Sequence, residues 1–243
     1  MDIKELESGV DPHTHWYYQS KKQPLLRFVS SLQADALHLI DVGAGSGFFS
    51  LELQHCFPQT FSQISLVDTA YTEEEISRSG GEPVKKQHEL PVKIEQSLVL
   101  MMDVLEHLEN DTRMLTQIKA RASADTPNHF FITVPAFKSV WSAHDVYLGH
   151  YRRYTKSSLK KVLLDNGFIV DKIYYLYGTL FPLVFLKRKL SAFFASDNAS
   201  PQSDMKQLPS WLNALSLKYS SLEMVFTKYN TWFGLTCVAE GRF

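Results

Sequence analysis

The fold is decided by the stretch Leu37-His38-Leu39-Ile40-Asp41-Val42-Gly43-Ala44-Gly45-Ser46-Gly47. Its first six residues predict a buried strand, and residues 48–56 predict the helix that follows. Glycine at alternate positions permits positive φ, so a ligand can lie against bare backbone there, and the amides at the start of the helix can hold a carboxylate or a phosphate. The alternative is an ordinary tight turn between a strand and a helix.

Strand and helix signals alternate along the rest of the chain. Further strands are expected at 64–67, 98–102, 130–134 and 168–175, and helices at 23–31, from Asp103 through Ile118, and at 156–166, where Gly167 ends the helix. Such alternation predicts an open, doubly wound α/β sheet with helices on both faces. Ligands bind such sheets beyond the carboxyl ends of the strands, which is where the glycine loop lies.

Composition excludes several classes of protein. The chain has 243 residues, 44% of them hydrophobic, and 25 Lys+Arg balance 26 Asp+Glu. One globular domain without a nucleic-acid partner is therefore expected. The two cysteines, Cys56 and Cys237, suit neither a disulfide framework nor a structural zinc site, which favours a reducing cytoplasm.

Targeting signals are also missing from the expected places. Residues 1–11 carry acids where a secretory signal would need a basic start and an apolar run. The longest apolar stretch, Leu180 to Leu186, contains Pro182 and is far shorter than the roughly 20 residues of a spanning helix. We therefore expect neither export nor a membrane span.

The spacing of the loop residues distinguishes between cofactors. A nicotinamide fingerprint needs glycine or alanine at the sixth position, where Gly43-x-Gly45-x-x-Phe48 has a phenylalanine, so a nicotinamide oxidoreductase is disfavoured. Asp68 ends the next strand and is placed to accept hydrogen bonds from both hydroxyls of a ribose. The plainer alternative for Asp68 is an exposed helix N-cap.

These features resemble the class I S-adenosylmethionine-dependent methyltransferases. The matching motifs are the glycine loop, Asp68, Asp103-Val104-Leu105-Glu106-His107, Ile132-Thr133-Val134-Pro135-Ala136-Phe137, Trp141, His144-Asp145 and His150-Tyr151-Arg152-Arg153-Tyr154-Thr155. The later motifs resemble a bacterial subgroup that methylates small molecules, and the resemblance covers roughly residues 13–178. It implies a Rossmann-like, seven-stranded sheet, mostly parallel, whose antiparallel last strand lies within 233–243, in a single domain with a helical acceptor cap inserted at 179–232.

The resemblance also implies a place for S-adenosylmethionine. Gly43, Ala44 and Gly45 would face its methionine part, with Asp41 anchoring the ammonium group. Asp68 would bind the ribose and Thr69 would lie beside the adenine, while Met102, Asp103 and Val104 would line the methionine end. A further adenine contact is expected after the third strand, but Gln87-His88-Glu89 matches that position poorly.

Several polar residues could serve the acceptor. Methyl transfer is an in-line displacement, in which the protein aligns the acceptor and removes its proton, so His107 and His144 are the candidate bases. Packing at a helix start is the alternative for His107. Trp141, Asp145, His150, Arg152 and Arg153 are expected to contact the acceptor, and an arginine there could bind a phosphate or carboxylate. Alternatively, one arginine packs inside and the other meets solvent.

Two absences narrow the chemistry. Glu106 and His107 could begin a metal site, but spacing shows no third ligand, so no metal is expected. The Asp/Asn-Pro-Pro-aromatic motif of many amino-methylating members is replaced by Asp103-Val104-Leu105-Glu106. Oxygen is therefore the favoured acceptor atom, with carbon second.

The segment 180–194 mixes apolar residues with Lys187-Arg188-Lys189. This pattern suits a helix lying in a membrane surface, and it equally suits an acceptor cap or a homodimer interface. A linker is expected at Ala195 to Gln207, then another cap helix containing Trp211, Leu212, Leu215 and Leu217. The resemblance to the bacterial subgroup, some of whose members occur beside or fused to glycan-assembly enzymes, implies an acceptor that is a small molecule or is linked to a lipid or glycan. The competing hypothesis is a regulatory module that binds the adenosyl cofactor without catalysis.

Overall fold

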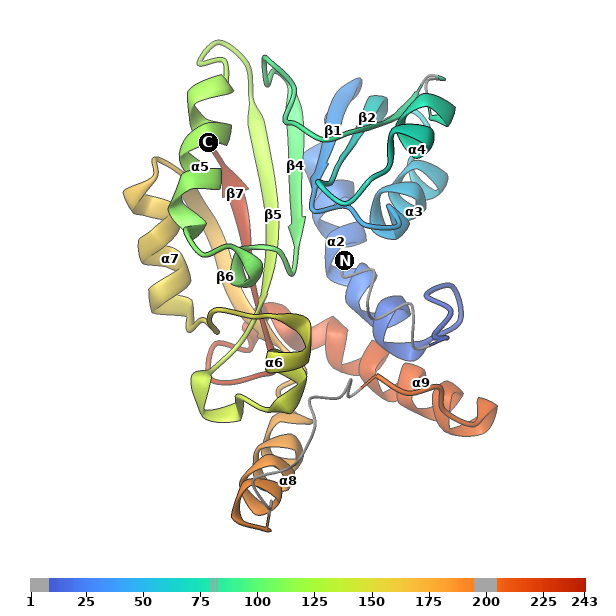
Figure 1. Cartoon of the computed structure of the whole chain (residues 1–243), viewed down its shortest axis with the longest axis vertical. Coiled ribbons are helices and arrows are strands. Elements are labelled where there is room, and N and C mark those ends of the chain that lie inside the picture. The colour runs from blue at the N-terminus through green and yellow to red at the C-terminus, as the bar shows by residue number, and fades with distance from the viewer. Residues whose placement is uncertain (1–8, 80, 82, 195–204) are drawn as a thin grey trace.

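The structure, a computed structural model, describes residues 9–79, 81, 83–194 and 205–243 (Figure 1). In this part of the chain seven strands form one sheet in the order β3-β2-β1-β4-β5-β7-β6. The strands are β1 (Leu37–Val42), β2 (Phe61–Val67), β3 (Val84–Gln87), β4 (Ser97–Met102), β5 (Asn128–Pro135), β6 (Ile169–Leu176) and β7 (Thr236–Arg242). The described helices are α2 (Trp16–Leu32), α3 (Phe48–Cys56), α4 (Glu73–Arg78), α5 (Asp111–Arg121), α6 (Ala143–Leu148), α7 (Lys156–Asp165), α8 (Phe181–Phe194) and α9 (Ser210–Phe226).

The predicted sheet is confirmed. Strands β1 to β5 pair in parallel, whereas β7 runs antiparallel to both of its neighbours. Strand order reverses at β1, since β2 lies on one side of it and β4 on the other, and the loops after these strands border the crevice where ligands bind in such folds.

Two apolar cores cover the two faces of the sheet. One core includes Leu25 and Phe28 of α2 and Leu53 of α3, and the other includes Leu115 of α5 and Leu159 of α7. Every residue of β4 is buried, as a central strand of a doubly covered sheet requires. The sheet thereby gives the loops at its carboxyl edge a rigid base.

The helix expected at 23–31 is longer than predicted. It starts at Trp16 and contains Pro24, a residue that commonly marks the first turn of a helix. The helix expected from Asp103 through Ile118 is interrupted: a single 3-10 turn, η1 (Leu105–His107), precedes α5. The loop after β5 is also partly helical, with η2 (Lys138–Val140) before α6. His144 and Asp145 therefore lie on α6 and not in an irregular loop.

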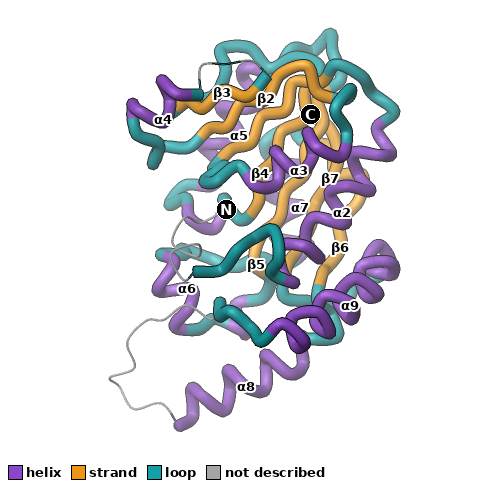
Figure 2. The backbone as a smooth tube through the Cα atoms, turned by 90° about the vertical axis from the view of Figure 1, so that its right-hand side faces the viewer, coloured by secondary structure: helices purple, strands orange, loops and turns teal. Residues whose placement is uncertain are grey.

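Helices α8 and α9 lie between β6 and β7 in the sequence. Helix α9 runs beside α2 (Figure 2), where Gln23 Nε2 donates to Ser221 Oγ at 2.6 Å and Arg27 Nη2 donates to the carbonyl of Met224 at 2.6 Å. Helix α8 projects beyond the carboxyl edge of β4 (Figure 1). Among the described helices, none combines the length and the hydropathy that crossing a bilayer requires. Most of the expected linker, residues 195–204, lies outside the described part of the chain.

Candidate functional site

The glycine loop joins β1 to α3 at the carboxyl edge of the sheet. Gly43, Gly45 and Gly47 all have positive φ, at 68°, 53° and 74°. A Cβ on Gly43 would lie 2.8 Å from Cγ2 of Val104, and one on Gly47 would lie 2.7 Å from Cδ1 of Leu66. Both the backbone conformation and the close neighbours therefore demand glycine here, and the three glycines present main chain without side chains, with Gly43 half-buried and Gly45 and Gly47 buried.

Asp68 is tied directly to this loop. Its Oδ2 accepts a hydrogen bond from the amide of Gly45 at 2.9 Å, and its Oδ1 accepts one from the amide of Ala70, also at 2.9 Å. Each carboxylate oxygen can accept a second hydrogen bond, so the side chain is fixed in place and still able to receive two hydroxyl donors. The exposed Thr69 adjoins it.

Tyr71, which was not predicted from the sequence, also contacts this loop. Its buried hydroxyl donates to the carbonyl of Gly45 at 2.7 Å. Burial raises the pKa of Tyr71, with the charges of Asp41 and Asp68 adding to the effect, so the hydroxyl stays protonated and remains a donor. A tyrosine four residues after a strand has no distinctive local pattern, which is why it escaped prediction.

Asp41 lies buried beneath the loop. Its Oδ2 accepts a hydrogen bond from the hydroxyl of Ser50, on α3, at 2.7 Å. Burial raises the pKa of the Asp41 carboxyl to about 6, against the opposing effect of the Ser50 hydrogen bond, and the nearby Asp68 charge raises it further. A cation brought to this carboxylate would favour its ionised form.

Asp103 follows β4 with a left-handed backbone, φ 56°. Thr133 Oγ1 donates to its Oδ1 at 2.8 Å, and the backbone amide of Asp103 donates to the Thr133 carbonyl at 3.0 Å. A non-glycine residue with this φ is held by its surroundings, and such strain clusters at functional sites. Val104, next in the chain, is buried against Gly43, and Met102 is buried at the end of β4.

Lys21 of α2 forms an ion pair with Asp103, a contact that sequence analysis missed. Its side chain is 1% exposed, and its Nζ also donates to the hydroxyl of Tyr17 at 3.0 Å. Burial would raise the pKa of Asp103, but the charge and hydrogen bond of Lys21, together with Thr133, lower it below its usual value. Helical spacing puts Lys21 on the same face as Leu25 and Phe28, so a lysine on an apolar stripe was the available signal.

Glu106 and His107 lie in η1, directly after Asp103. Glu106 is fully buried, and within the described residues neither carboxylate oxygen has a hydrogen-bond partner. Burial raises the pKa of Glu106 well above its usual value, and the Asp103 charge adds to this. His107 is half-buried at the same turn.

Asp145 organises the segment that follows β5. Its carboxylate accepts hydrogen bonds from Arg153 Nε at 2.6 Å and from the Ser142 amide at 2.8 Å, and His150 Nδ1 lies 3.0 Å away. Burial would raise the pKa of Asp145, but the hydrogen bonds from His150 and Arg153 and the Arg153 charge hold it well below its usual range. Asp145 and Arg153 are thus partners of each other, and direct contact of either with an acceptor stays a prediction.

The two adjacent arginines differ in their surroundings. Arg153 is 5% exposed, whereas Arg152 is 31% exposed and pairs with the buried Asp111 at 3.1 Å. This matches the alternative in which one arginine packs inside and the other meets solvent. Trp141 and His144 are half-buried in the same segment, at the end of η2 and on α6.

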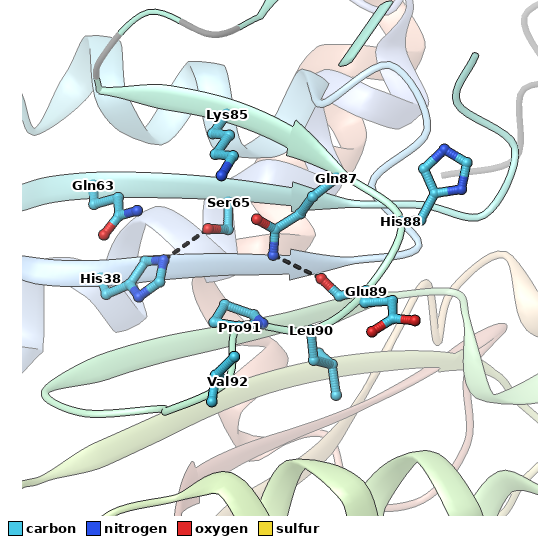
Figure 3. A pocket seen from close by; sticks show the side chains of 10 residues that line it. All are labelled: His38, Gln63, Ser65, Lys85, Gln87, His88, Glu89, Leu90, Pro91 and Val92. Atoms are coloured by element: carbon cyan, nitrogen blue, oxygen red, sulfur yellow. Dashed lines mark hydrogen bonds between the residues drawn. The ribbon is translucent and has the colours of Figure 1, made fainter. Parts of the chain in front are cut away.

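A separate polar hollow of about 500 Å³ lies on the face of β1, β2 and β3 (Figure 3). His38 and Ser65 share a hydrogen bond of 2.8 Å at its floor, and Gln87 Nε2 donates to the carbonyl of Glu89 at 2.7 Å. Gln87, His88 and Glu89 line this hollow, which extends to His38 near the amino end of β1 and so away from the glycine loop. The adenine contact expected at these three residues stays a prediction.

Comparisons with known proteins agree with this architecture. A family model described as a methyltransferase domain matches residues 13–173. A search of the curated proteins found no match. Among solved structures, an S-adenosylmethionine-dependent methyltransferase from Archaeoglobus fulgidus is similar over 99% of this chain and 98% of its own, at 16% identity and a TM-score of 0.55.

Two further structures have the same fold. A chain of the Haloferax volcanii complex that contains the Trm112 methyltransferase activator has 15% identity and a TM-score of 0.54, covering 95% of this chain and 90% of its own. Phosphoethanolamine N-methyltransferase 2 of Haemonchus contortus, solved with S-adenosyl-L-methionine, has 13% identity and a TM-score of 0.53, covering 91% of this chain and 52% of its own. Since the methyltransferase-domain model spans most of the chain, this protein belongs to the S-adenosylmethionine-dependent methyltransferase family, whose cofactor is S-adenosylmethionine.

Proposed function

We propose that the protein transfers a methyl group from S-adenosylmethionine to an oxygen of a small-molecule acceptor or of one linked to a lipid or glycan. The observation that carries the cofactor placement is the hydrogen bond from Gly45 to Asp68, which joins the bare loop and the carboxylate into one surface. The close approaches of Val104 to Gly43 and of Leu66 to Gly47 fix the course of the loop and exclude side chains from these two positions.

In this proposal the loop residues Gly43, Ala44 and Gly45 face the methionine part of the cofactor. Asp68 accepts hydrogen bonds from the ribose hydroxyls, and Thr69 borders the adenine. Asp41 anchors the ammonium group from beneath the loop, where that cation would offset the cost of burying the ionised carboxylate. Met102, Asp103 and Val104 close the methionine end, with Asp103 held in position by Lys21 and Thr133.

The bound cofactor supplies an electrophilic methyl group on a sulfonium. The acceptor oxygen bonds to that carbon as the carbon–sulfur bond breaks and its electron pair stays on sulfur. The protein's task is to align the acceptor and to take its proton. His144 and His107 are the candidate bases, and His150 is a candidate acceptor contact whose ring Asp145 orients.

The cofactor placement is tested by calorimetric titration with S-adenosylmethionine. Asp68→Ala removes the ribose acceptor and the Gly45 partner, and we expect affinity to fall by about 100-fold. Asp165→Ala, on the exposed side of α7, is the matched control and should bind normally. Unchanged affinity in Asp68→Ala would refute the placement.

Catalysis is tested separately, against the alternative of a non-catalytic cofactor-binding module. Release of S-adenosylhomocysteine in the presence of acceptor mixtures identifies an enzyme, and tight cofactor binding without product favours the regulatory module. For the base, we expect His144→Ala to keep cofactor affinity while slowing turnover by about 100-fold. Normal turnover in that variant would remove His144 from the mechanism.

We further propose that residues 179–232 form the acceptor cap and that its apolar outer face receives a lipid-linked acceptor at a membrane surface. Helix α9 exposes Trp211, Leu215, Leu222 and Phe226 at helical spacing, and α8 exposes Leu183, Leu186 and Leu190. Lys187 and Lys189 of α8 are also exposed, which suits anionic headgroups.

Co-sedimentation with anionic lipid vesicles tests this surface. Binding that weakens at high salt supports it. Concentration-dependent dimers in sedimentation velocity without vesicle binding would assign the face to a homodimer. Capture of an activator protein, such as accompanies the Haloferax volcanii relative, would assign it to a protein partner.

A further inference from the structure

The segment after β5 folds back onto the turn after β4. The amide of Tyr151 donates to the carbonyl of Glu106 at 2.7 Å, and the hydroxyl of Tyr154 donates to Asp111 at 2.7 Å. These contacts bring His150 against η1, where its ring lies perpendicular to that of His107 at a centroid distance of 4.6 Å. Two imidazoles that are distant in the sequence thus become neighbours.

The carboxylate of Glu106 completes a group of three. One oxygen of Glu106 and one ring nitrogen each of His107 and His150 all lie within 4.8 Å of one another. Glu106 is 0% exposed, and neither of its oxygens has a hydrogen-bond partner among the residues that the structure describes. An ionised carboxylate that is buried without a partner is costly, so either a proton or a bound cation has to compensate it at this point.

Asp145 prepares His150 for a ligand role. The Asp145 carboxylate lies 3.0 Å from Nδ1 of His150 and is itself fixed by Arg153 and the Ser142 amide. Because a carboxylate can only accept here, Nδ1 carries the proton and Nε2 keeps its lone pair. Metal-bound histidines characteristically have a carboxylate in this supporting position.

We propose that Glu106, His107 and His150 bind a divalent transition cation of the zinc class. Two imidazoles and one carboxylate form a three-ligand set that leaves a coordination position open, whereas Mg²⁺ and Ca²⁺ prefer oxygen ligands throughout. This proposal departs from the expectation of no metal. Spacing alone showed two candidate ligands, and the third candidate comes from a segment that only the tertiary fold brings to η1.

The position of the proposed metal site suggests that the cation binds the acceptor, an inference that rests on the proposed function. Glu106 comes three residues after Asp103, which lies at the methionine end of the proposed cofactor crevice. A cation there would bind the acceptor oxygen at its open position and favour loss of the hydroxyl proton. His107 would then be a ligand, which leaves His144 as the candidate base.

Metal binding is measured on the chelator-treated full-length protein without cofactor or acceptor. Titration with ZnCl₂ should give one site per chain, with MgCl₂ binding at least about 100-fold more weakly. CoCl₂ should give visible absorption bands of a nitrogen- and oxygen-ligated ion. Glu106→Gln and His150→Ala should each weaken zinc binding by about 100-fold or more, and His88→Ala, which removes an exposed histidine remote from the cluster, should not.

Thermal unfolding shows whether Glu106 is a metal ligand or only a buried residue that packs in the core. Zinc should raise the melting temperature of the wild type and leave that of Glu106→Gln unchanged. Asp145→Asn, which keeps all three ligands, should weaken zinc binding by about 10- to 100-fold. Zinc binding of equal strength in Glu106→Gln and the wild type, or the absence of a one-to-one site, would overturn the proposal. Because cofactor affinity is measured separately without metal, failure here is distinct from failure of the cofactor placement.

Discussion

The two halves of the carboxyl edge are built in different ways. On the β1–β2 side, the glycine loop and Asp68 are joined mainly by main-chain groups, with Gly45 as the central residue. On the β5 side, the segment 141–154 is organised by one buried carboxylate, Asp145, and the side chains around it. A surface made of main chain serves a cofactor that is common to a family, whereas a surface made of side chains can change with the acceptor.

The largest expected effect comes from a substitution in the network of side chains around Asp145. Arg153→Met removes the cation that is hydrogen-bonded to the buried Asp145 and leaves Arg188 4.0 Å away, so we expect the free energy of unfolding in urea to fall by about 3 kcal/mol. Since the folded-state pKa of Asp145 is lowered, its stabilising contribution is present above the unfolded value and is lost as the pH falls through the folded value. The penalty should therefore persist from pH 5 to 8 and shrink only in strong acid.

The neighbouring arginine is the matched control. Arg152→Met removes a partly exposed ion pair, and the expected loss is below about 1 kcal/mol. Equal losses in the two variants would mean that the Asp145 network does not hold this segment together.

The next largest effect is expected from a substitution in the glycine loop. Gly45→Val places a β-branched residue at φ 53°, and we expect cofactor affinity to fall by about 100-fold. Ser46→Ala, an exposed neighbour in the same loop, should bind almost normally. If calorimetry gave the same affinity for both, the main chain at residue 45 would not face the cofactor.

The pH dependence of cofactor affinity tests the role of Asp41 beneath the glycine loop. With a pKa of about 6, its carboxyl should be mostly neutral at pH 5 and mostly ionised at pH 7, so cofactor affinity should rise by about tenfold between them. In Asp41→Asn the affinity should be weak and independent of pH over this range.

Folding stability should move in the opposite direction at Asp41. The raised folded-state pKa means that the protonated form favours folding, and this contribution is lost as the pH rises through about 6. Asp41→Asn should therefore approach the stability of the wild type only below about pH 4, the unfolded value, and should be more stable at pH 8, by about 1–3 kcal/mol in urea titrations. Reduced stability at pH 8 would assign Asp41 a purely structural role.

The smallest effect on the fold is expected at the outer face of the cap. Leu222→Ser, at a side chain 64% exposed, should change stability by no more than about 0.5 kcal/mol and should weaken vesicle binding. Met224→Ser, on the buried side of the same helix, should cost about 2–5 kcal/mol. Unaltered vesicle binding in Leu222→Ser would exclude this side chain from the membrane-facing surface.

The difference between the halves also explains what the sequence could predict. The glycine loop, β1, α3 and the position of Asp68 follow from local patterns of apolar residues and glycines, so they were predictable. The pairing of Lys21 with Asp103 spans 82 positions, and His150 meets Glu106 only because Tyr151 bonds back to η1. Such partners depend on tertiary contacts that leave no regular spacing, which is why the roles of Lys21 and Tyr71 and the approach of His150 to Glu106 escaped prediction.

The antiparallel last strand has a consequence for how new activities arise. Leu176 ends β6 and pairs with Thr236 at the start of β7, and the amide of Leu235 donates to the carbonyl of Leu176 at 2.9 Å. The whole excursion between them leaves and re-enters the sheet at neighbouring points. An insert of different length or sequence could therefore replace this segment without changing the order or direction of any strand, and if the segment is the acceptor cap proposed above, such an exchange would change the acceptor while the rest of the sheet stays the same.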